Sequence, residues 1–339
     1  MTTQYRDVGV DLDAADAIKA RIGAAVGTTR TALARGAFGG FGGMLALPGG
    51  YRRPLLVMST DGVGTKVLVA VAAQRHDGIG ADLVNHSVND VLVHGARPIA
   101  FQDYLALGTL DGAVVTAIVD GIARGCREHA MTLTGGETAQ LPDLYAPGLY
   151  DLAGTILGVV DEPDALHGDR VRAGDVVIGY EASGLHTNGY SLARRVVFDA
   201  LGLSPTDPFP EHDASVADVL LAVHRSYYRA VRPILGVVHA LAHVTGGGIP
   251  GNLVRVLPPD CHATIESGAW PEPALFGVLR RAGGIEEREM RRVFNLGLGF
   301  LAVAPAGAAE SVRSAATRAD VKTWVVGTIG RGDREVVFR

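Results

Sequence analysis

The segment LLVMSTDGVGTK, from Leu55 to Lys66, places an acid, two glycines and a lysine directly after a run of four apolar residues. The apolar run predicts a short buried strand, and the polar residues are expected on the turn that follows it. Glycines in such a turn let backbone amides approach an anion, Lys66 can offset phosphate charge, and Asp61 offers the oxygen ligand that Mg²⁺ prefers. The segment is not a Walker A loop, because Thr65 separates Gly64 from Lys66. Taken alone, it is better explained as a tight turn with one surface acid.

The composition is that of a globular chain with a small-molecule ligand. A length of 339 residues predicts two domains, and 47% hydrophobic residues can fill two cores. The net charge of −5 and the lack of a basic stripe argue against nucleic acid and membrane partners. Cys126 and Cys261 lie far apart in the sequence, which argues against a disulfide framework or a structural zinc site. Without a signal-peptide core or a transmembrane stretch, the chain is expected to be cytoplasmic.

A glycine-rich loop, Gly36–Gly43, follows an expected helix at residues 12–26. Such a loop is mobile until a ligand or a neighbouring segment orders it. A flexible connector and a lid over a ligand both explain the loop. Phe38 and Phe41 favour the lid, because spacers rarely contain two aromatic residues.

The segment from Asp82 to His94 has the clearest periodicity in the chain and predicts a helix. One side of this helix is apolar, and the other contains polar residues: Asp82, Asn85, His86 and Asn89, with Asp90 at the edge. A solvated face is the usual explanation, but this face has none of the Lys, Arg or Glu typical of exposed helices. Asp90 and Asn89 are therefore predicted to be functional, and His86 to be structural.

A second acid is expected just past a strand. Met131–Thr134 predicts a short strand, and Gly135-Gly136-Glu137 follows it directly. Together with Asp90, the two strand-end acids Asp61 and Glu137 predict an oxygen cluster for one or two Mg²⁺ ions that bridge phosphate groups.

The second half of the chain contains two polar turns. A break at Glu162-Pro163 and a turn at 171–175 predict an N-terminal domain of residues 1–168 and a C-terminal domain of residues 169–339. In the turn Ser183–Leu192, capping is the ordinary role of Thr187 and Asn188, although a helix start also offers free amides to phosphate. In the turn His243–Gly248, the histidine alone would be a packed core residue, whereas three consecutive glycines favour ligand binding.

In this order and spacing, the motifs resemble those of the phosphoribosylformylglycinamidine cyclo-ligases, also called aminoimidazole ribonucleotide synthetases, of purine biosynthesis. The resemblance covers nearly the whole chain. Each motif is weak alone, but the ordered set is highly specific. The motifs are Tyr5–Asp11, Phe38–Gly43, Thr60–Lys66, Val88–Asp90, Gly135–Ala139, Ser183–Leu192, His243–Gly248 and Phe294–Gly299.

The resemblance implies an α+β protein. Its N-terminal α+β domain would pair its sheet with that of a second copy in a dimeric barrel, and its C-terminal α/β domain would have a mixed sheet. The implied homodimer uses ATP and Mg²⁺ to phosphorylate the formyl oxygen of formylglycinamidine ribonucleotide. The amidine nitrogen then attacks that carbon and expels phosphate. Positioning and charge neutralisation carry most of such a reaction.

The resemblance also implies roles for individual residues. Asp61, Asp90 and Glu137 would hold the metal. His186, His243 and Lys66 would be catalytic, the histidines as proton-transfer or substrate contacts. The nucleotide would contact Gly39, Gly40, Gly42, Gly43, Asp61, Gly62, Gly64, Thr65, Lys66 and Asn89. The ribonucleotide would contact Ser183, Asn188, Thr245, Gly246, Gly247 and Gly248.

The chain departs from the family pattern at three positions. Family members commonly have lysines near the positions of Gly23 and Gly27, and many have a second acid where Gln140 stands. These departures concern phosphate contacts of the N-terminal segment and leave the three acids intact. Two alternatives stay open: another ATP-dependent phosphotransfer enzyme of the same superfamily, such as thiamine-monophosphate kinase, and a catalytically silent nucleotide-binding paralogue. Nucleotide binding without ADP release would identify the silent paralogue.

Overall fold

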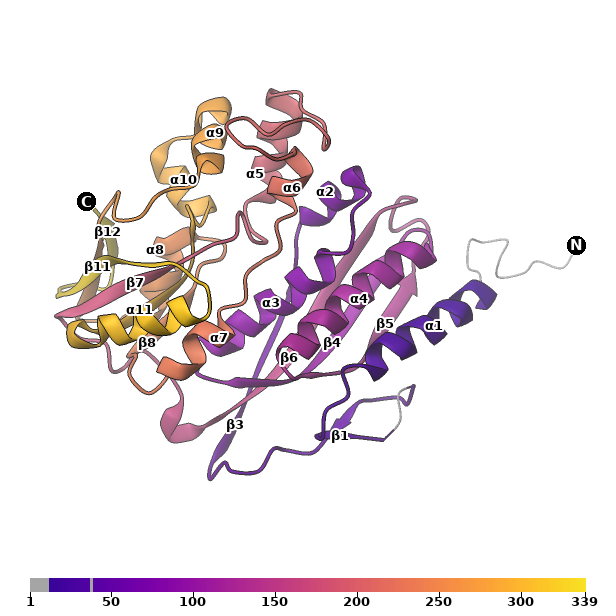
Figure 1. The fold of residues 1–339 in the computed structure, drawn as a ribbon, viewed down its shortest axis with the longest axis horizontal. Helices are drawn as coiled ribbons and strands as arrows, with labels where there is room; N and C mark the ends of the chain where they lie inside the picture. The colour runs from indigo at the N-terminus through magenta and orange to yellow at the C-terminus, as the bar shows by residue number, and fades with distance from the viewer. Residues whose placement is uncertain (1–11, 37–38) are drawn as a thin grey trace, which may run out of the picture.

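The structure is a computed structural model that describes residues 12–36 and 39–339, so the Tyr5–Asp11 motif and Phe38 lie outside the described residues. The N-terminal half forms a four-stranded sheet with helices on one face (Figure 1). The strand order is β3-β6-β4-β5, in which β4 and β5 are parallel and the other pairs antiparallel. The elements are α1 (Leu12–Gly27), β1 (Ala34–Arg35), β2 (Met44–Leu45), β3 (Pro54–Gly62), α2 (Lys66–Ala73), α3 (Ile79–Leu92), β4 (Arg97–Leu107), α4 (Gly112–Glu128), β5 (Thr132–Gln140), β6 (Tyr150–Asp161) and the 3₁₀ turn Glu162–Asp164.

The C-terminal half forms a six-stranded mixed sheet in the order β12-β9-β11-β7-β10-β8. The β12–β9 pair is parallel, and the other pairs are antiparallel. The strands are β7 (Asp175–Glu181), β8 (Ala240–His243), β9 (Cys261–Ile265), β10 (Leu298–Pro305), β11 (Thr323–Arg331) and β12 (Val336–Phe338). The helices are α5 (Tyr190–Arg194), continued by the π-helical turn Arg195–Ala200, then α6 (Val216–Leu220), α7 (Tyr228–Val231), α8 (Gly248–Leu253), α9 (Ala274–Gly283), α10 (Glu287–Val293) and α11 (Ala309–Arg318), with 3₁₀ turns at Arg232–Ile234, Val254–Val256 and Ala306–Ala308.

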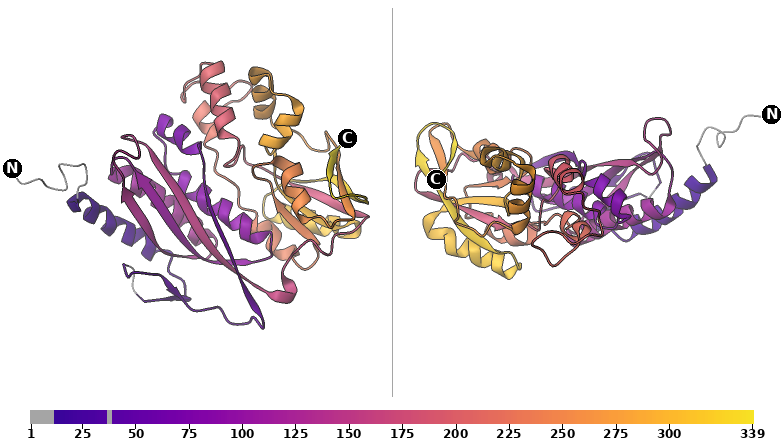
Figure 2. Two further views of the ribbon diagram at one scale, coloured as in Figure 1. Left: turned by 180° about the vertical axis from the view of Figure 1, so that it is seen from behind. Right: turned by 90° about the horizontal axis from the view of Figure 1, so that it is seen from above.

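These two sheets confirm the α+β class and the mixed C-terminal sheet. In the N-terminal half, α3 and α4 pack together against one face of the sheet. Viewed from behind in Figure 2, the strands lie in front of these helices, so no helix among the described residues covers the opposite face of the sheet. That open face has exposed apolar side chains, among them Leu56 at 53% and Tyr104 at 42% exposure. None of the described helices combines the length and the apolar character that crossing a bilayer would require.

Two strands are longer than the sequence predicts. β3 continues through Asp61 to Gly62 because Ser59–Gly62 pair with β6. β5 continues through Glu137 to Gln140 because it pairs with β4, with a register shift after Phe101. The prediction that Asp61 and Glu137 follow strand ends is therefore wrong. Pairing with a neighbouring strand outweighs the low strand propensity of Gly and Asp at these positions.

Candidate active site

Asp61 and Asp90 lie side by side at the end of β3 and the last turn of α3. The Nε2 atom of His86 is 2.8 Å from Asp61 Oδ2 and 3.5 Å from Asp90 Oδ2. Asp90 also accepts hydrogen bonds from Ser59 Oγ at 3.0 Å and from His243 Nδ1 at 2.8 Å. Burial alone would raise the pKa of both carboxyls, but the hydrogen bonds and charge interactions with these histidines lower it. The site therefore holds two ionised carboxylates.

These two acids face a cavity of about 500 Å³ between the two halves of the chain. His243 and Thr245, from the predicted His243–Gly248 turn, also line it. Further lining residues escaped the sequence analysis, because none stands in a glycine-rich or acidic motif: His94, His167, Asn252 and Arg255.

Glu137 does not join the other two acids within one chain. Glu137 pairs with Tyr104 on β4, Tyr104 with Ala153 on β6, and Ala153 with Gly62 on β3. Three strand spacings, or roughly 14 Å, thus separate Glu137 from the β3 backbone. Asp61 directly precedes Gly62 on β3 and points to the face covered by α3. Because side chains alternate along a strand, Gly62 and the residues paired across from it, including Glu137, face the open side of the sheet. The expected three-acid cluster is wrong for a single chain.

Glu137 instead lies beside the glycine-rich loop. The two together line a second cavity, of about 410 Å³, on the open face of the sheet, and the loop residues are Gly39, Gly40, Phe41, Gly42 and Gly43. The sequence analysis did not predict this proximity and grouped Glu137 with Asp61 and Asp90.

Lys66 is fully buried and does not face the main cavity. Its Nζ atom is 2.9 Å from Asp82 Oδ1, 2.7 Å from the carbonyl oxygen of Ala222 and 3.3 Å from that of His186. These contacts use all three N–H donors of the ammonium group. Burial lowers the pKa of Lys66, and the opposed charge of Asp82 works against that shift. In this geometry Lys66 joins the two halves of the chain and leaves no donor for a phosphate group.

The polar side of α3 is buried against the segment 221–227 of the C-terminal half. Asn85 Nδ2 donates to the carbonyl of His224 at 2.8 Å. Asn89 Nδ2 donates to the carbonyl of Arg225 at 2.9 Å, and Asn89 Oδ1 accepts from the amide of Tyr227 at 2.9 Å. The helix prediction is thus confirmed. The missing Lys and Glu reflect burial between the halves, and Asn89 holds a backbone segment in place.

His186 lies behind the cavity and does not line it. Its ring stacks on His224 with centroids 4.0 Å apart, and its Nε2 accepts the Ser183 amide at 3.2 Å. Burial lowers the pKa of His186 well below its usual value, so the ring is neutral. His224 belongs to no motif, so the sequence analysis did not identify it, and His86 was predicted to be structural only.

The remaining predicted residues make local contacts, and that of Thr65 joins the two halves. Ser183 Oγ donates to the carbonyl of Val223, and Thr65 Oγ1 lies 3.0 Å from Ser191 Oγ. Gly64, just before α2, has a φ of 56°, which favours glycine. The Gly62 amide donates to Asp61 Oδ1 at 2.7 Å.

The side chain of Asn252 fixes the backbone of the triple-glycine turn. Asn252 Nδ2 lies 2.8 Å from the Gly248 carbonyl and 3.3 Å from that of Gly246. Gly247 has a φ of 96°, and a Cβ on Gly248 would lie 1.9 Å from the carbonyl oxygen of Arg291. Packing therefore requires glycine at 248. The Asn188 Nδ2 atom is buried without a hydrogen-bond partner, and a Cβ on Gly246 would lie 3.6 Å from Asn188 Oδ1.

Comparison with known proteins covers both halves. Residues 49–160 match the family described as AIR synthase related protein, N-terminal domain, and residues 172–339 match AIR synthase related protein, C-terminal domain. The chain is 48% identical to the phosphoribosylformylglycinamidine cyclo-ligase of Sorangium cellulosum, over 97% of this chain and 96% of the relative. It is 46% identical to the protein of the same name from Anaeromyxobacter dehalogenans, over 98% and 97% of the two chains.

Solved structures share the fold at low sequence identity. Thiamine-monophosphate kinase from Stenotrophomonas maltophilia superimposes with a TM-score of 0.68 at 20% identity, over 95% of this chain and 94% of the other. Hydrogenase maturation protein HypE in complex with ATP also gives a TM-score of 0.68 at 20% identity, over 92% and 88%. At this identity the likeness concerns the fold alone.

Proposed function

Since the chain belongs to the phosphoribosylformylglycinamidine cyclo-ligase family, ATP-dependent enzymes that form 5-aminoimidazole ribonucleotide in purine biosynthesis, we propose that its ring closure takes place in the cavity beside Asp61 and Asp90. The observation that carries this proposal is the meeting of two ionised carboxylates at a cavity of about 500 Å³. Such a volume suits a ribonucleotide. The cytoplasm is the compartment in which we propose that the enzyme acts.

The donor set at this cavity fits Mg²⁺. Asp61 and Asp90 each offer a carboxylate oxygen, and the two oxygens and His86 Nε2 lie within 4.8 Å of one another. We propose that these two acids hold the ion. The ion would neutralise the charge of the ATP phosphates during transfer to the formyl oxygen.

The surrounding side chains position the acids and the substrate. His243 and Ser59 donate to opposite oxygens of Asp90 and so fix the plane of its carboxylate. Arg255 is the only Lys or Arg among the described residues that line the cavity, and we propose that it binds the ribonucleotide phosphate. Thr245 lines the same cavity, whereas Ser183, Asn188 and Gly246–Gly248 do not. His186 and Lys66 have positioning roles in this proposal, because neither lines the cavity.

The nucleotide is proposed to reach the carboxylates from the side of the glycine-rich loop. Gly39–Gly43 and Glu137 line the second cavity, on the open face of the sheet. Backbone amides of glycines suit phosphate oxygens. Asp61 lies on β3 next to Thr60, which lines this second cavity, and β3 is an edge strand of the sheet, so the nucleotide would pass around this edge to the carboxylates.

An isotope experiment tests the reaction. Formylglycinamidine ribonucleotide that carries ¹⁸O in its formyl group is supplied with ATP and Mg²⁺. We expect the label in the released phosphate, because phosphoryl transfer makes the formyl oxygen part of the leaving group. Label found in water, or label retained in the ribonucleotide while ADP accumulates, would contradict activation of that oxygen.

We propose further that two copies pair through the open faces of their four-stranded sheets. A mixed sheet with exposed apolar side chains on a face that no described helix covers needs a partner, and a second copy offers a matching one. Such pairing would also cover the second cavity and Glu137.

Leu56→Glu is expected to abolish this dimer. Leu56 lies on the open face and does not line the main cavity, so the change introduces one buried charge per subunit of a dimer. Analytical ultracentrifugation should find a dimer for the unaltered chain and a monomer for Leu56→Glu. Val237→Glu, at a site in the C-terminal half with 43% exposure, is the control and should stay dimeric. A monomeric unaltered chain would rule out the proposed pairing.

A further inference from the structure

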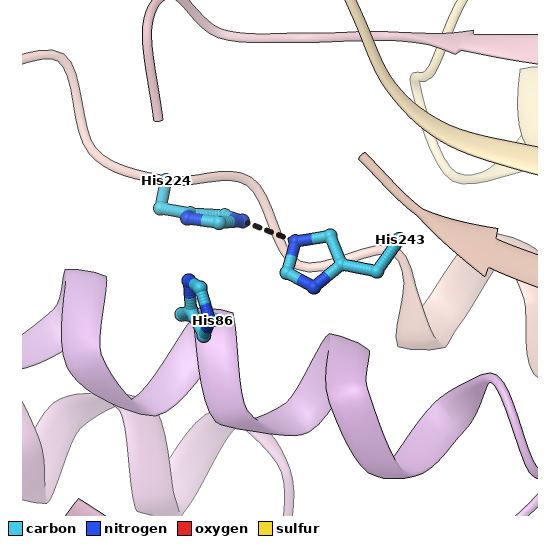
Figure 3. Close-up of side chains that lie close together, drawn as sticks. All are labelled: His86, His224 and His243. Carbon is cyan, nitrogen blue, oxygen red and sulfur yellow. Dashed lines mark hydrogen bonds between the residues drawn. The ribbon is translucent and has the colours of Figure 1, made fainter. Parts of the chain in front are cut away.

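Three buried imidazole rings from separate segments of the chain converge (Figure 3). His86 comes from α3, His224 from the segment before α7, and His243 from the end of β8. Their ring centroids are 5.3 Å apart for His86–His224, 4.9 Å for His86–His243 and 5.1 Å for His224–His243. Each ring can offer one nitrogen atom, and the three atoms lie within 4.8 Å of one another.

The hydrogen bonds fix which nitrogen of two rings carries a proton. Asp90 can only accept, so His243 Nδ1 carries a proton and donates it at 2.8 Å. Asn89 is oriented by the Tyr227 amide, so its Nδ2 donates to His224 Nε2 at 3.2 Å. His224 therefore has its proton on Nδ1, 3.3 Å from Thr187 Oγ1.

As a result, two Nε2 atoms face each other. His224 Nε2 and His243 Nε2 are 3.1 Å apart. With both protons on Nδ1, Asn89 Nδ2 donates to the lone pair of His224 Nε2, and the lone pair of His243 Nε2 meets that same atom without a donor between them. A cation between them would turn that repulsion into attraction.

We propose that His86, His224 and His243 form a buried site for a transition-metal ion of the Zn²⁺ type. In a tetrahedral site with metal–nitrogen distances of about 2.0–2.1 Å, ligand nitrogens lie about 3.3–3.4 Å apart and ring centroids roughly 5 Å apart. The three centroid distances already have this size. His86 would bind through Nδ1, which now lies 2.7 Å from Thr187 Oγ1.

The two carboxylates that contact the rings, Asp61 and Asp90, support such a site. Histidines that bind metals usually donate their other N–H to a carboxylate, which orients the ring and raises its basicity. Asp90 receives this bond from His243, and Asp61 lies 2.8 Å from His86 Nε2. The proposed Mg²⁺ site uses carboxylate oxygen atoms of these acids, whereas this site uses ring nitrogen atoms of the three histidines. The ion would tie α3 of the N-terminal half to two segments of the C-terminal half.

Metal content and a cobalt spectrum test the proposal on the full-length chain. After incubation with Zn²⁺ and dialysis, we expect one zinc ion per chain by elemental mass spectrometry. The Co²⁺ form should show intense visible absorption of a tetrahedral site and paramagnetically shifted N–H resonances from imidazole ligands. His224→Gln should weaken Co²⁺ binding by about 100-fold or more. His212→Gln, at an exposed loop histidine, is the control and should leave binding unchanged.

Three results would overturn the site. The first is a chain that binds neither Zn²⁺ nor Co²⁺ at micromolar concentration, as expected if one proton is shared between the two Nε2 atoms. The second is Co²⁺ binding without shifted imidazole resonances, a readout on the unaltered chain that does not depend on how a variant folds. The third is binding that survives His224→Gln but is lost in Asp61→Asn, which would place the ion on the carboxylates. None of these results bears on the ¹⁸O experiment, so the two proposals fail independently.

Discussion

Asp90→Asn should fold normally and lose about 100-fold in turnover. The asparagine keeps one oxygen to accept a hydrogen bond from Ser59 or His243, so the packing around residue 90 survives. It removes the negative charge that we propose to hold Mg²⁺ against the phosphates of ATP. ADP release with formylglycinamidine ribonucleotide, measured across a range of Mg²⁺ concentrations, gives both the loss and its dependence on the metal.

The matched control for this variant is Asp120→Asn. Asp120 is an exposed acid on α4, away from both cavities, and its change alters net charge by the same amount. Thermal unfolding should be similar for both variants and the unaltered chain. If Asp90→Asn turns over at the normal rate at every Mg²⁺ concentration, Asp90 has no part in metal binding.

Lys66→Met should destabilise the fold by about 3–5 kcal/mol, because it leaves Asp82 as a buried charge without its partner. Asp82 Oδ1 keeps its contact with the His224 amide at 2.7 Å, but that bond alone does not neutralise the carboxylate. Urea unfolding, followed by circular dichroism, measures the change in the free energy of unfolding. The loss is expected in stability first, and in activity only through the altered junction of the two halves.

The double variant Lys66→Met/Asp82→Asn separates a structural role from a catalytic one. The asparagine retains an acceptor for the His224 amide and removes the buried charge, so most of the lost stability should return. Recovery of both stability and turnover would identify Lys66 as a positioning residue. Recovery of stability with turnover still abolished would instead give Lys66 a direct role in phosphate transfer.

The sequence predicted helices better than it predicted their surroundings. The α3 helix follows from apolar residues at helical spacing, a local pattern that needs no partner. The burial of its polar side depends on the segment 221–227, more than a hundred positions later in the chain. No local sequence pattern predicts a contact between segments so far apart in the chain. The same distance explains why His224 was missed and why Lys66 was assigned to phosphate and not to Asp82.

The prediction for Glu137 was wrong for a different reason. Side chains alternate between the two faces of a strand, so an error of one residue moves a side chain to the opposite face. The pairing of β5 with β4, including its register shift after Phe101, decides the face of Glu137. Asp61 and Asp90 came together as predicted because α3 crosses the end of β3 on the covered face.

The buried polar side of α3 has a consequence for how this protein can be divided. A fragment ending near residue 168 would expose Asp82, Asn85 and Asn89 to solvent and remove their hydrogen-bond partners in segment 221–227. A fragment starting there would leave backbone amides and carbonyls of that segment with only water to bind. Each half would then lack the internal surface that the other supplies, so the chain is better regarded as one cooperative body with two main sheets than as a pair of exchangeable modules.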